Sequence, residues 1–174
     1  MRFATASRIV ALPLVLAACA GPSPSSPVAA AGASYVVVRH AEKGTDDPKD
    51  PALTEAGRRR ADALALQFDG TLLTAAYATG YKRTQQTALP SATASGVGVT
   101  TYDAASSPRE FAAGLRRDHA RGKVLIVGHS NTVPEIVSAL CDCPIAPMTD
   151  TDYGRVFEVT LDGAGRASLI ERTY

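Results

Sequence analysis

Apolar residues recur along the chain with two spacings, one typical of buried strands and one typical of amphipathic helices. The continuous apolar run at residues 35–38 is typical of a strand that is covered on both faces. After it, Thr54 can cap a helix whose apolar positions are Ala61, Leu64, Ala65 and Phe68. Further strands are predicted at residues 75–79, 97–102 and 124–127. Strand and helix therefore alternate over most of the chain.

Helix start and stop signals lie where the apolar spacing changes. A helix is predicted from about Lys82, and Pro90 should end or kink it. Residues 107–110 place a capping serine, a first-turn proline and a capping-box glutamate in order, and residues 132–135 repeat the capping-box pattern. Each signal therefore predicts a helix that follows a strand.

The order of these elements predicts the fold class. Two apolar segments at 155–161 and 167–172 are joined through Asp162-Gly163, which indicates a hairpin. Strands separated by helices imply right-handed crossovers and parallel pairing. We therefore expect a three-layer α/β/α sandwich with a mainly parallel sheet and a C-terminal hairpin, in one domain over residues 35–174.

The N-terminal segment is typical of an export signal. Arg2 and Arg8 give it a positive start, and the apolar run at 9–18 is too short to cross a bilayer. Residues 16–19, Leu-Ala-Ala-Cys, resemble the lipobox at which bacterial signal peptidase II cuts. We therefore expect a lipoprotein signal peptide over residues 1–18 and a lipid anchor on Cys19.

Residues 19–34 are predicted to tether the folded domain to that anchor. Between Ala20 and Ser34 every residue except Val28 is Gly, Pro, Ser or Ala, a composition that cannot build a core. The expected location is the bacterial cell envelope. In a Gram-negative host we expect an outer-membrane lipoprotein that faces the periplasm, since Ala20 and not Asp follows the cysteine; otherwise the anchored domain would be extracellular.

Composition and charge exclude some partners. The chain has 174 residues, 45% of them hydrophobic, and 18 basic against 17 acidic side chains, for a net charge of +1. This is an ordinary globular composition with no field that would gather nucleic acid. Any chemistry on phosphate must therefore come from a few placed residues.

Such residues follow three of the predicted strands. Arg39 and His40 follow the first strand, Arg83 follows the second, and His129 follows the strand at 124–127. Taken singly, each has a simpler interpretation as an exposed histidine, a helix-face charge or a turn. Because the carboxyl ends of parallel strands share one rim of a sheet, however, we expect these side chains to lie together. Two arginines and a histidine can surround a dianionic phosphate, and the second histidine could then act as nucleophile.

These motifs resemble those of the histidine phosphatase, or phosphoglycerate-mutase-like, superfamily over roughly residues 35–174. Arg39-His40 is similar to its Arg-His signature, Arg83 to the arginine of an R-T-x-x-T-A stretch at 83–88, and Gly128-His129 to its late Gly-His motif. One departure is that the frequent Arg-His-Gly is here Arg39-His40-Ala41, as in the Arg-His-Ala-Glu variants of small phosphatases. No side chain needed for the chemistry is lost.

The resemblance implies a two-step transfer in which His40 attacks phosphorus and water resolves the phosphohistidine. Arg39, Arg83 and His129 would bind the phosphoryl oxygens, and the two arginines would favour a neutral His40. No cofactor and no metal are expected. Asp103, directly after the third strand, is the predicted proton donor, and Glu42 is the alternative acid.

Several questions stay open at the level of sequence. Cys141 and Cys143 could form a disulfide or remain two thiols. The function predicted first is an exported, lipid-anchored phosphomonoesterase with a small phosphorylated substrate, such as a sugar phosphate. The alternatives are a phosphohistidine-protein phosphatase and a non-catalytic envelope lipoprotein that binds a phosphate ligand. A phosphoglycerate mutase is disfavoured, because its substrates are cytoplasmic and the chain carries an export signal.

Overall fold

The structure is a computed structural model that describes residue 1, residues 32–68 and residues 70–174. Cys19, and the predicted signal peptide and tether apart from Met1 and residues 32–34, lie outside the described residues. Within the described part of the chain, no helix is long and apolar enough to cross a membrane.

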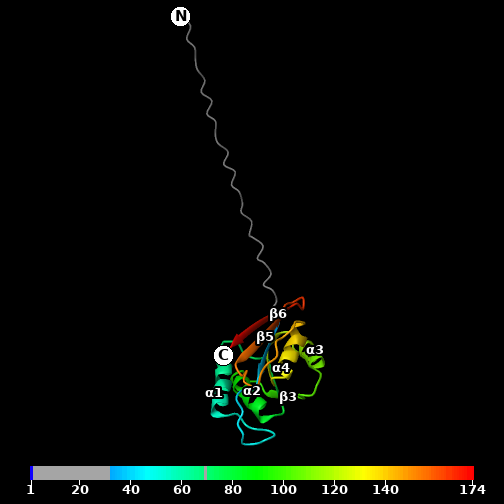
Figure 1. Cartoon of the computed structure of the whole chain (residues 1–174). Coiled ribbons are helices and arrows are strands. Elements are labelled where there is room, and N and C mark those ends of the chain that lie inside the picture. The colour runs from blue at the N-terminus through cyan, green and yellow to red at the C-terminus, as the bar shows by residue number, and fades with distance from the viewer. Residues whose placement is uncertain (2–31, 69) are drawn as a thin grey trace.

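Six strands form one mixed sheet in the order β3-β2-β4-β1-β5-β6. The strands are β1 (Ala33–Arg39), β2 (Ala75–Thr79), β3 (Val99–Tyr102), β4 (Gly122–Gly128), β5 (Arg155–Leu161) and β6 (Ala167–Thr173). The first four pair in parallel, whereas β5 runs antiparallel to both β1 and β6. The predicted mainly parallel sheet and C-terminal hairpin are thus confirmed (Figure 1).

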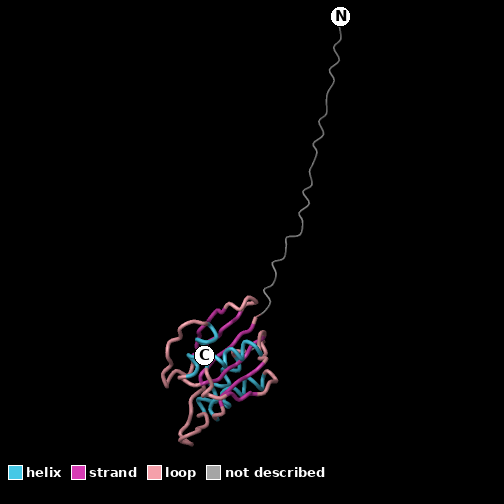
Figure 2. Tube along the Cα trace, turned by 90° about the vertical axis from the view of Figure 1, so that its right-hand side faces the viewer, coloured by secondary structure: helices cyan, strands magenta, loops and turns pink. Residues whose placement is uncertain are grey.

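The described part of the chain forms four helices, which pack on the two faces of this sheet. Figure 2 shows the helices lying close to the strands. The helices are α1 (Glu55–Leu66), α2 (Lys82–Ala94), α3 (Pro108–Asp118) and α4 (Thr132–Cys141). Alternate residues of β1 pack on opposite faces of the sheet. Val36 and Val38 belong to the apolar cluster that contains residues of α1 and α2. Tyr35 and Val37 belong to the cluster that contains residues of α3 and α4. Burial of each such side chain stabilises the fold by roughly 1.5–3 kcal/mol.

The helix ends agree with most of the local signals. Thr54 caps α1 by accepting a hydrogen bond from the Gly57 N–H at 3.1 Å, and the Ser107 hydroxyl caps α3. The capping box predicted at 132–135 is wrong, because the Thr132 hydroxyl accepts from the His129 N–H at 3.0 Å instead of from its own helix. Pro90 lies inside α2 and does not end it.

A disulfide joins Cys141, the last residue of α4, to Cys143. It spans Asp142, which ends the helix in the left-handed conformation with φ of 53°. Of the two alternatives left open by the sequence, the structure therefore contains the disulfide. The loop that follows it leads across the carboxyl edge of the sheet to β5.

Candidate active site

The Arg39-His40 motif and the Gly128-His129 motif meet at the carboxyl ends of the paired strands β1 and β4. Arg39 is in register with Gly128, and the His40 N–H donates to the Gly128 carbonyl at 3.0 Å. The rings of His40 and His129 follow directly, with centroids 5.4 Å apart in an edge-to-face arrangement. The structure therefore brings together the two histidines that the sequence placed on one rim.

His40 is a buried, neutral imidazole with one free nitrogen. Its Nδ1 lies 2.8 Å from the Ala41 carbonyl oxygen, which can only accept, so Nδ1 carries the proton and Nε2 keeps a lone pair. Burial lowers the pKa of His40 to about 3, and the charges of Arg39 and Arg83 lower it as well. The predicted effect of the arginines on the imidazolium is confirmed in direction, although burial is the larger cause.

His129 is oriented by a chain of threonine hydroxyls. Its Nε2 lies 3.0 Å from the Thr79 hydroxyl, which lies 2.8 Å from the Thr84 hydroxyl. Thr84 also contacts the carbonyls of Thr79 and Tyr81, to which its hydroxyl proton must be donated. Thr84 therefore accepts from Thr79, Thr79 accepts from Nε2, and Nδ1 is the nitrogen left for a ligand. Burial, followed by the charges of Arg83 and Arg39, lowers the pKa of His129 to about 4.

The two arginines each lie against a tyrosine ring. The Arg39 guanidinium lies 4.4 Å from the ring centre of Tyr153 and donates from Nη1 to the Thr149 carbonyl at 3.0 Å. The Arg83 guanidinium lies 4.2 Å from the ring centre of Tyr81. Both Nε atoms are buried without a hydrogen-bond partner in the described part of the chain. Unpaired buried donors are costly, so this arrangement favours binding of an anion.

Glu42, the alternative acid, lies outside the pocket that contains His40, in the segment that follows His40, called the His40 loop below. Arg60 donates to its carboxylate from Nε and from Nη2, at 2.9 and 2.7 Å. These hydrogen bonds lower the pKa of Glu42. The same loop is fixed on its other side by the Ala41 N–H, which donates to the Thr87 hydroxyl at 3.0 Å. Glu42 and Thr87 therefore position the backbone around His40.

Asp103, the predicted proton donor, follows β3 but does not line the pocket that contains His40. Its Oδ1 accepts from the Ala105 N–H at 2.9 Å, and it lines a neighbouring hollow together with Thr79 and Gly80. The adjacent Ala104 lines the pocket instead. The catalytic role of Asp103 stays a prediction.

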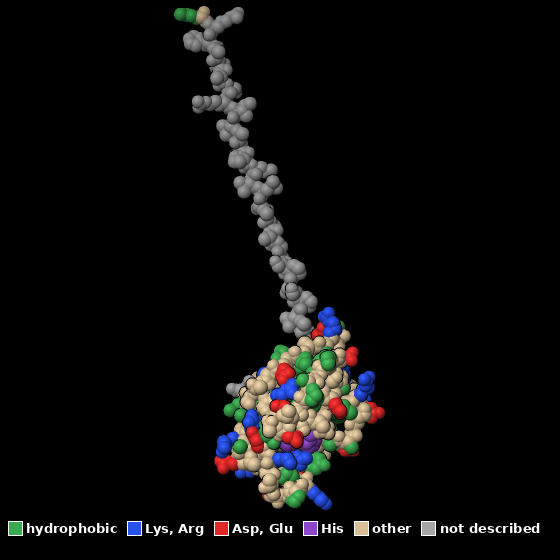
Figure 3. Space-filling view, viewed as in Figure 1, with side chains coloured by type: hydrophobic (Ala, Val, Ile, Leu, Met, Phe, Trp, Pro, Cys, Tyr) green, Lys and Arg blue, Asp and Glu red, His purple; other side chains and the backbone are tan. Residues whose placement is uncertain are grey.

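The histidines and arginines open into a surface pocket of about 410 Å³. In the space-filling view, histidine surface lies between basic and acidic side chains on the lower part of the domain (Figure 3). The residues that line this pocket, called the catalytic pocket below, are Arg39, His40, Lys43, Tyr81, Arg83, Ala104, His129, Ser130, Asn131, Thr132, Asp150 and Tyr153.

Among the residues of this wall that the sequence did not predict are Tyr81, Asp150 and Tyr153. The last two belong to residues 142–154, a loop with no apolar period that could have placed it against Arg39. Tyr81 directly precedes α2 and carried a weak signal, namely its position just after a predicted strand.

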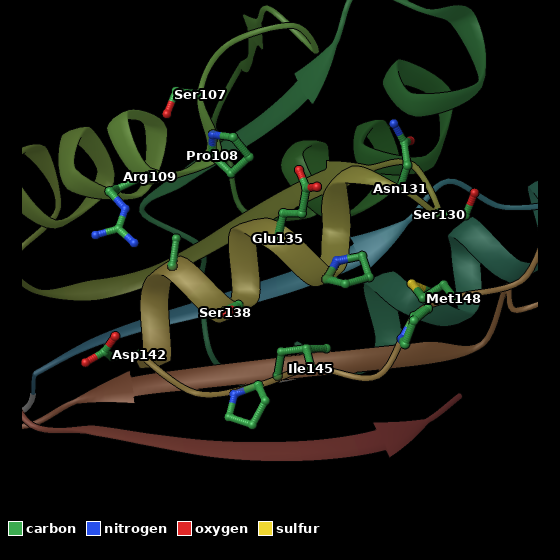
Figure 4. Close-up of a pocket in the computed structure, with 14 residues that line it drawn as sticks. Ser107, Pro108, Arg109, Ser130, Asn131, Glu135, Ser138, Asp142, Ile145 and Met148 are labelled. Atoms are coloured by element: carbon green, nitrogen blue, oxygen red, sulfur yellow. The ribbon is translucent and has the colours of Figure 1, made fainter.

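A second and larger hollow of about 910 Å³ runs along the outer side of α4. Figure 4 shows Glu135 and Ser138 on that helix, with Arg109 at the start of α3 to one side and Ile145 and Met148 to the other. It shares Ser130 and Asn131 with the catalytic pocket but contains neither histidine of the pair. We therefore assign the chemistry to the smaller pocket. No group of three or more His, Cys, Asp or Glu side chains that could hold a metal ion occurs among residues 32–68 and 70–174.

One segment of the chain matches a known protein family. Residues 35–106 match the histidine phosphatase superfamily (branch 1). No curated protein matches the sequence of the chain.

Several solved structures share the fold. The protein histidine phosphatase SixA complexed with tungstate matches with a TM-score of 0.66 and 19% identity, over 80% of this chain and 96% of that one. A putative phosphohistidine phosphatase SixA from Nakamurella multipartitia matches with a TM-score of 0.58 and 22% identity, over 83% and 97% of the two chains. The mycobacterial glucosyl-3-phosphoglycerate phosphatase matches with a TM-score of 0.62 and 13% identity, over 79% and 97%.

The matched segment contains the first Arg-His motif and the second arginine, and the shared fold brings the late Gly-His motif to the same pocket. The family match over residues 35–106, together with structural neighbours that are phosphatases, supports a phosphatase enzyme of the histidine type.

Proposed function

We propose that the protein is an exported, lipid-anchored phosphatase that hydrolyses phosphomonoesters through a phosphohistidine formed on His40. The observation that carries this proposal is the geometry around His40. A neutral imidazole lies in one pocket with two arginines, and within the described residues neither Nε2 of His40 nor the buried Nε atoms of the arginines have a hydrogen-bond partner. Such a pocket binds the phosphoryl group and supplies its nucleophile.

The reaction follows from these groups. Nε2 of His40 attacks phosphorus, the ester oxygen leaves, and a water molecule then displaces the imidazole from the phosphoryl group. Arg39 and Arg83 hold the phosphoryl oxygens in both steps, and no movement of charged side chains is needed at the moment of reaction. A bound dianion favours protonation of His129, which then donates from Nδ1 to a phosphoryl oxygen.

The substrate that we propose is a small phosphate ester, with sugar phosphates included. A pocket of about 410 Å³ at the surface accommodates a phosphoryl group with a leaving group of modest size. Structural neighbours include a phosphoserine phosphatase mutant in complex with phosphoserine and the glucosyl-3-phosphoglycerate phosphatase. These ligands support the small-substrate class without selecting one compound.

A second candidate substrate is a phosphohistidine on a protein. It is favoured by the hollow along α4, which continues from the catalytic pocket at Ser130 and Asn131 and gives room for a larger substrate. The two SixA neighbours are named as a protein histidine phosphatase and a putative phosphohistidine phosphatase. Turnover of a phosphohistidine peptide at a higher kcat/KM than any sugar phosphate would select this candidate.

The proposed location rests on the N-terminal sequence alone. A positive start, a short apolar run and a small-residue segment before Cys19 support export and lipidation. Cys19→Ser should release the full chain from membrane fractions, because the variant lacks the thiol that would carry the lipid. Tight membrane association of that variant would contradict the anchor.

The catalytic proposal is tested on the purified full-length chain with p-nitrophenyl phosphate. Rapid quenching with ³²P-labelled phosphate ester should trap acid-labile, base-stable label on a peptide that contains His40. His40→Ala should abolish both label and turnover, whereas His119→Ala, a histidine outside the pocket, should keep both. Label on His129, or undiminished turnover in His40→Ala, would reverse the assignment. No turnover in the unaltered chain would favour the non-catalytic alternative.

A further inference from the structure

Among residues 32–68 and 70–174, one carboxylate lines the catalytic pocket, and it belongs to Asp150. Its side chain is 92% exposed, so it is accessible to a bound substrate and to water. Asp150 Oδ1 accepts from the Ser130 hydroxyl at 3.1 Å and lies 3.6 Å from Nη2 of Arg39. The carboxylate is thus held between the two motifs of the site, because Arg39 precedes His40 and Ser130 follows His129.

Three other carboxylates lie near the pocket, and each has partners of its own. Glu42 is bound in two-pronged fashion by Arg60, and Asp103 accepts from the backbone of its own turn. Asp50 accepts from the Lys82 N–H at 2.8 Å, at the start of α2, and its Oδ1 also lies 3.9 Å from Nη1 of Arg83. These three carboxylates do not line the pocket. Position therefore distinguishes Asp150 from each of them.

The loop that carries Asp150 is built around Arg39. The Asp152 carboxylate accepts from the Thr149 N–H at 2.7 Å, and the Thr149 carbonyl accepts from Arg39. Tyr153 stacks on the same guanidinium. Asp150 lies between these anchored residues, so its backbone is fixed beside the pocket while its side chain remains at the mouth.

We propose that Asp150 is the proton donor for the leaving group and the base for the second step, which deepens and rests on the proposed phosphatase function. Substrate binding exchanges the Asp150 contact of Arg39 for contacts with phosphoryl oxygens. The freed carboxylate then lies beside the bound phosphoryl group, at the mouth of the pocket through which the leaving group departs.

The proton and electron pairs balance over the two steps. In the first, the bond from Nε2 of His40 to phosphorus forms, the bond from phosphorus to the ester oxygen breaks, and that oxygen takes the Asp150 proton. In the second, Asp150 takes a proton from the attacking water, the new oxygen–phosphorus bond forms, and the nitrogen–phosphorus bond returns its electron pair to His40. The products are an alcohol and phosphate, and Asp150 ends protonated as it began.

The test compares leaving groups on the full-length chain. Asp150→Asn should lower kcat/KM for glycerol phosphate by about 100-fold or more, because an alkoxide is a poor leaving group and needs a proton. The same variant should change kcat/KM for p-nitrophenyl phosphate only a few-fold, because its leaving group departs without a proton. Asp118→Asn, which alters an exposed carboxylate at the end of α3, is the matched control and should leave both unchanged.

A role of Asp150 in merely holding Arg39 makes a different prediction. If Asp150 only holds Arg39, Asp150→Asn should lower kcat/KM for both substrates equally and should weaken inhibition by inorganic phosphate. If Asp150 is the proton donor, the same variant should bind inorganic phosphate as tightly or more tightly, since one negative charge is removed. Equal losses, or a selective loss on glycerol phosphate in Asp103→Asn or Glu42→Gln, would overturn the proposal. Absence of turnover of both substrates in the unaltered chain would overturn the phosphatase function itself, and with it this role.

Discussion

Acidification should destabilise the folded domain through His40, and the size of the effect follows from the burial of that ring. The His40 side chain is almost fully buried, and its pKa falls from 6.5 to about 3 on folding. Between these two values the unfolded chain binds the proton and the folded chain does not. The contribution of His40 is therefore fully present above pH 6.5 and is lost progressively as the pH falls toward 3.

The magnitude can be worked out from the same two values. One pKa unit corresponds to about 1.4 kcal/mol, so lowering the pH from 7 to 5 should lower the free energy of unfolding by about 2 kcal/mol through His40. His129 acts in the same direction, since burial also lowers its pKa, but it is partly exposed and solvent screening reduces its share.

The assay is urea unfolding of the full chain at pH 7, 6 and 5 in a buffer without phosphate, because a bound anion would stabilise the folded state. His40→Asn provides the reference, since it removes the titrating ring and keeps a polar group of related shape. The unaltered chain should lose about 2 kcal/mol more than this variant between pH 7 and pH 5. NMR titration of the histidine ring protons should show His40 neutral throughout that range.

Two results would refute the reasoning. One is a His40 resonance that titrates with a midpoint near 6.5, which would mean that burial does not penalise the imidazolium. The other is an equal pH dependence of unfolding in the unaltered chain and in His40→Asn, which would place the acid sensitivity in other groups.

Three further predictions concern the residues that hold the site. Gly57→Ala should cost about 1–3 kcal/mol in urea unfolding, because a Cβ there would lie 2.3 Å from the Glu42 carbonyl oxygen. Arg60→Met should lower kcat/KM on p-nitrophenyl phosphate about tenfold, by a cost on the order of 1.4 kcal/mol. The reason is that the Glu42 carboxylate loses both of its hydrogen bonds from Arg60, and the His40 loop then loses its fixed position. Unchanged kinetics would contradict this prediction. Thr79→Val should lower kcat more than it raises KM, because His129 loses the hydroxyl that orients Nε2; a purely raised KM would assign Thr79 to substrate binding.

The sequence by itself determined the layers of the fold and the centre of the site. Apolar spacing identified the strands that end at Arg39 and Gly128, and parallel strands must present their carboxyl ends on one edge. The positions of His40 and His129 therefore followed from local pattern and topology, without knowledge of any contact. The hairpin at the end of the chain was equally local, because a two-residue turn signal joined two apolar segments.

Only the tertiary structure decided which groups complete the pocket. Asp150 and Tyr153 approach Arg39 from a loop far away in the chain, whose conformation depends on side-chain and backbone contacts with β1 and has no sequence period. Thr132 had a plausible partner in its own helix, but its hydroxyl bonds the backbone of His129. Such choices depend on which polar group lies nearest once the strands have paired, because burial makes each remaining donor and acceptor find a partner in three dimensions.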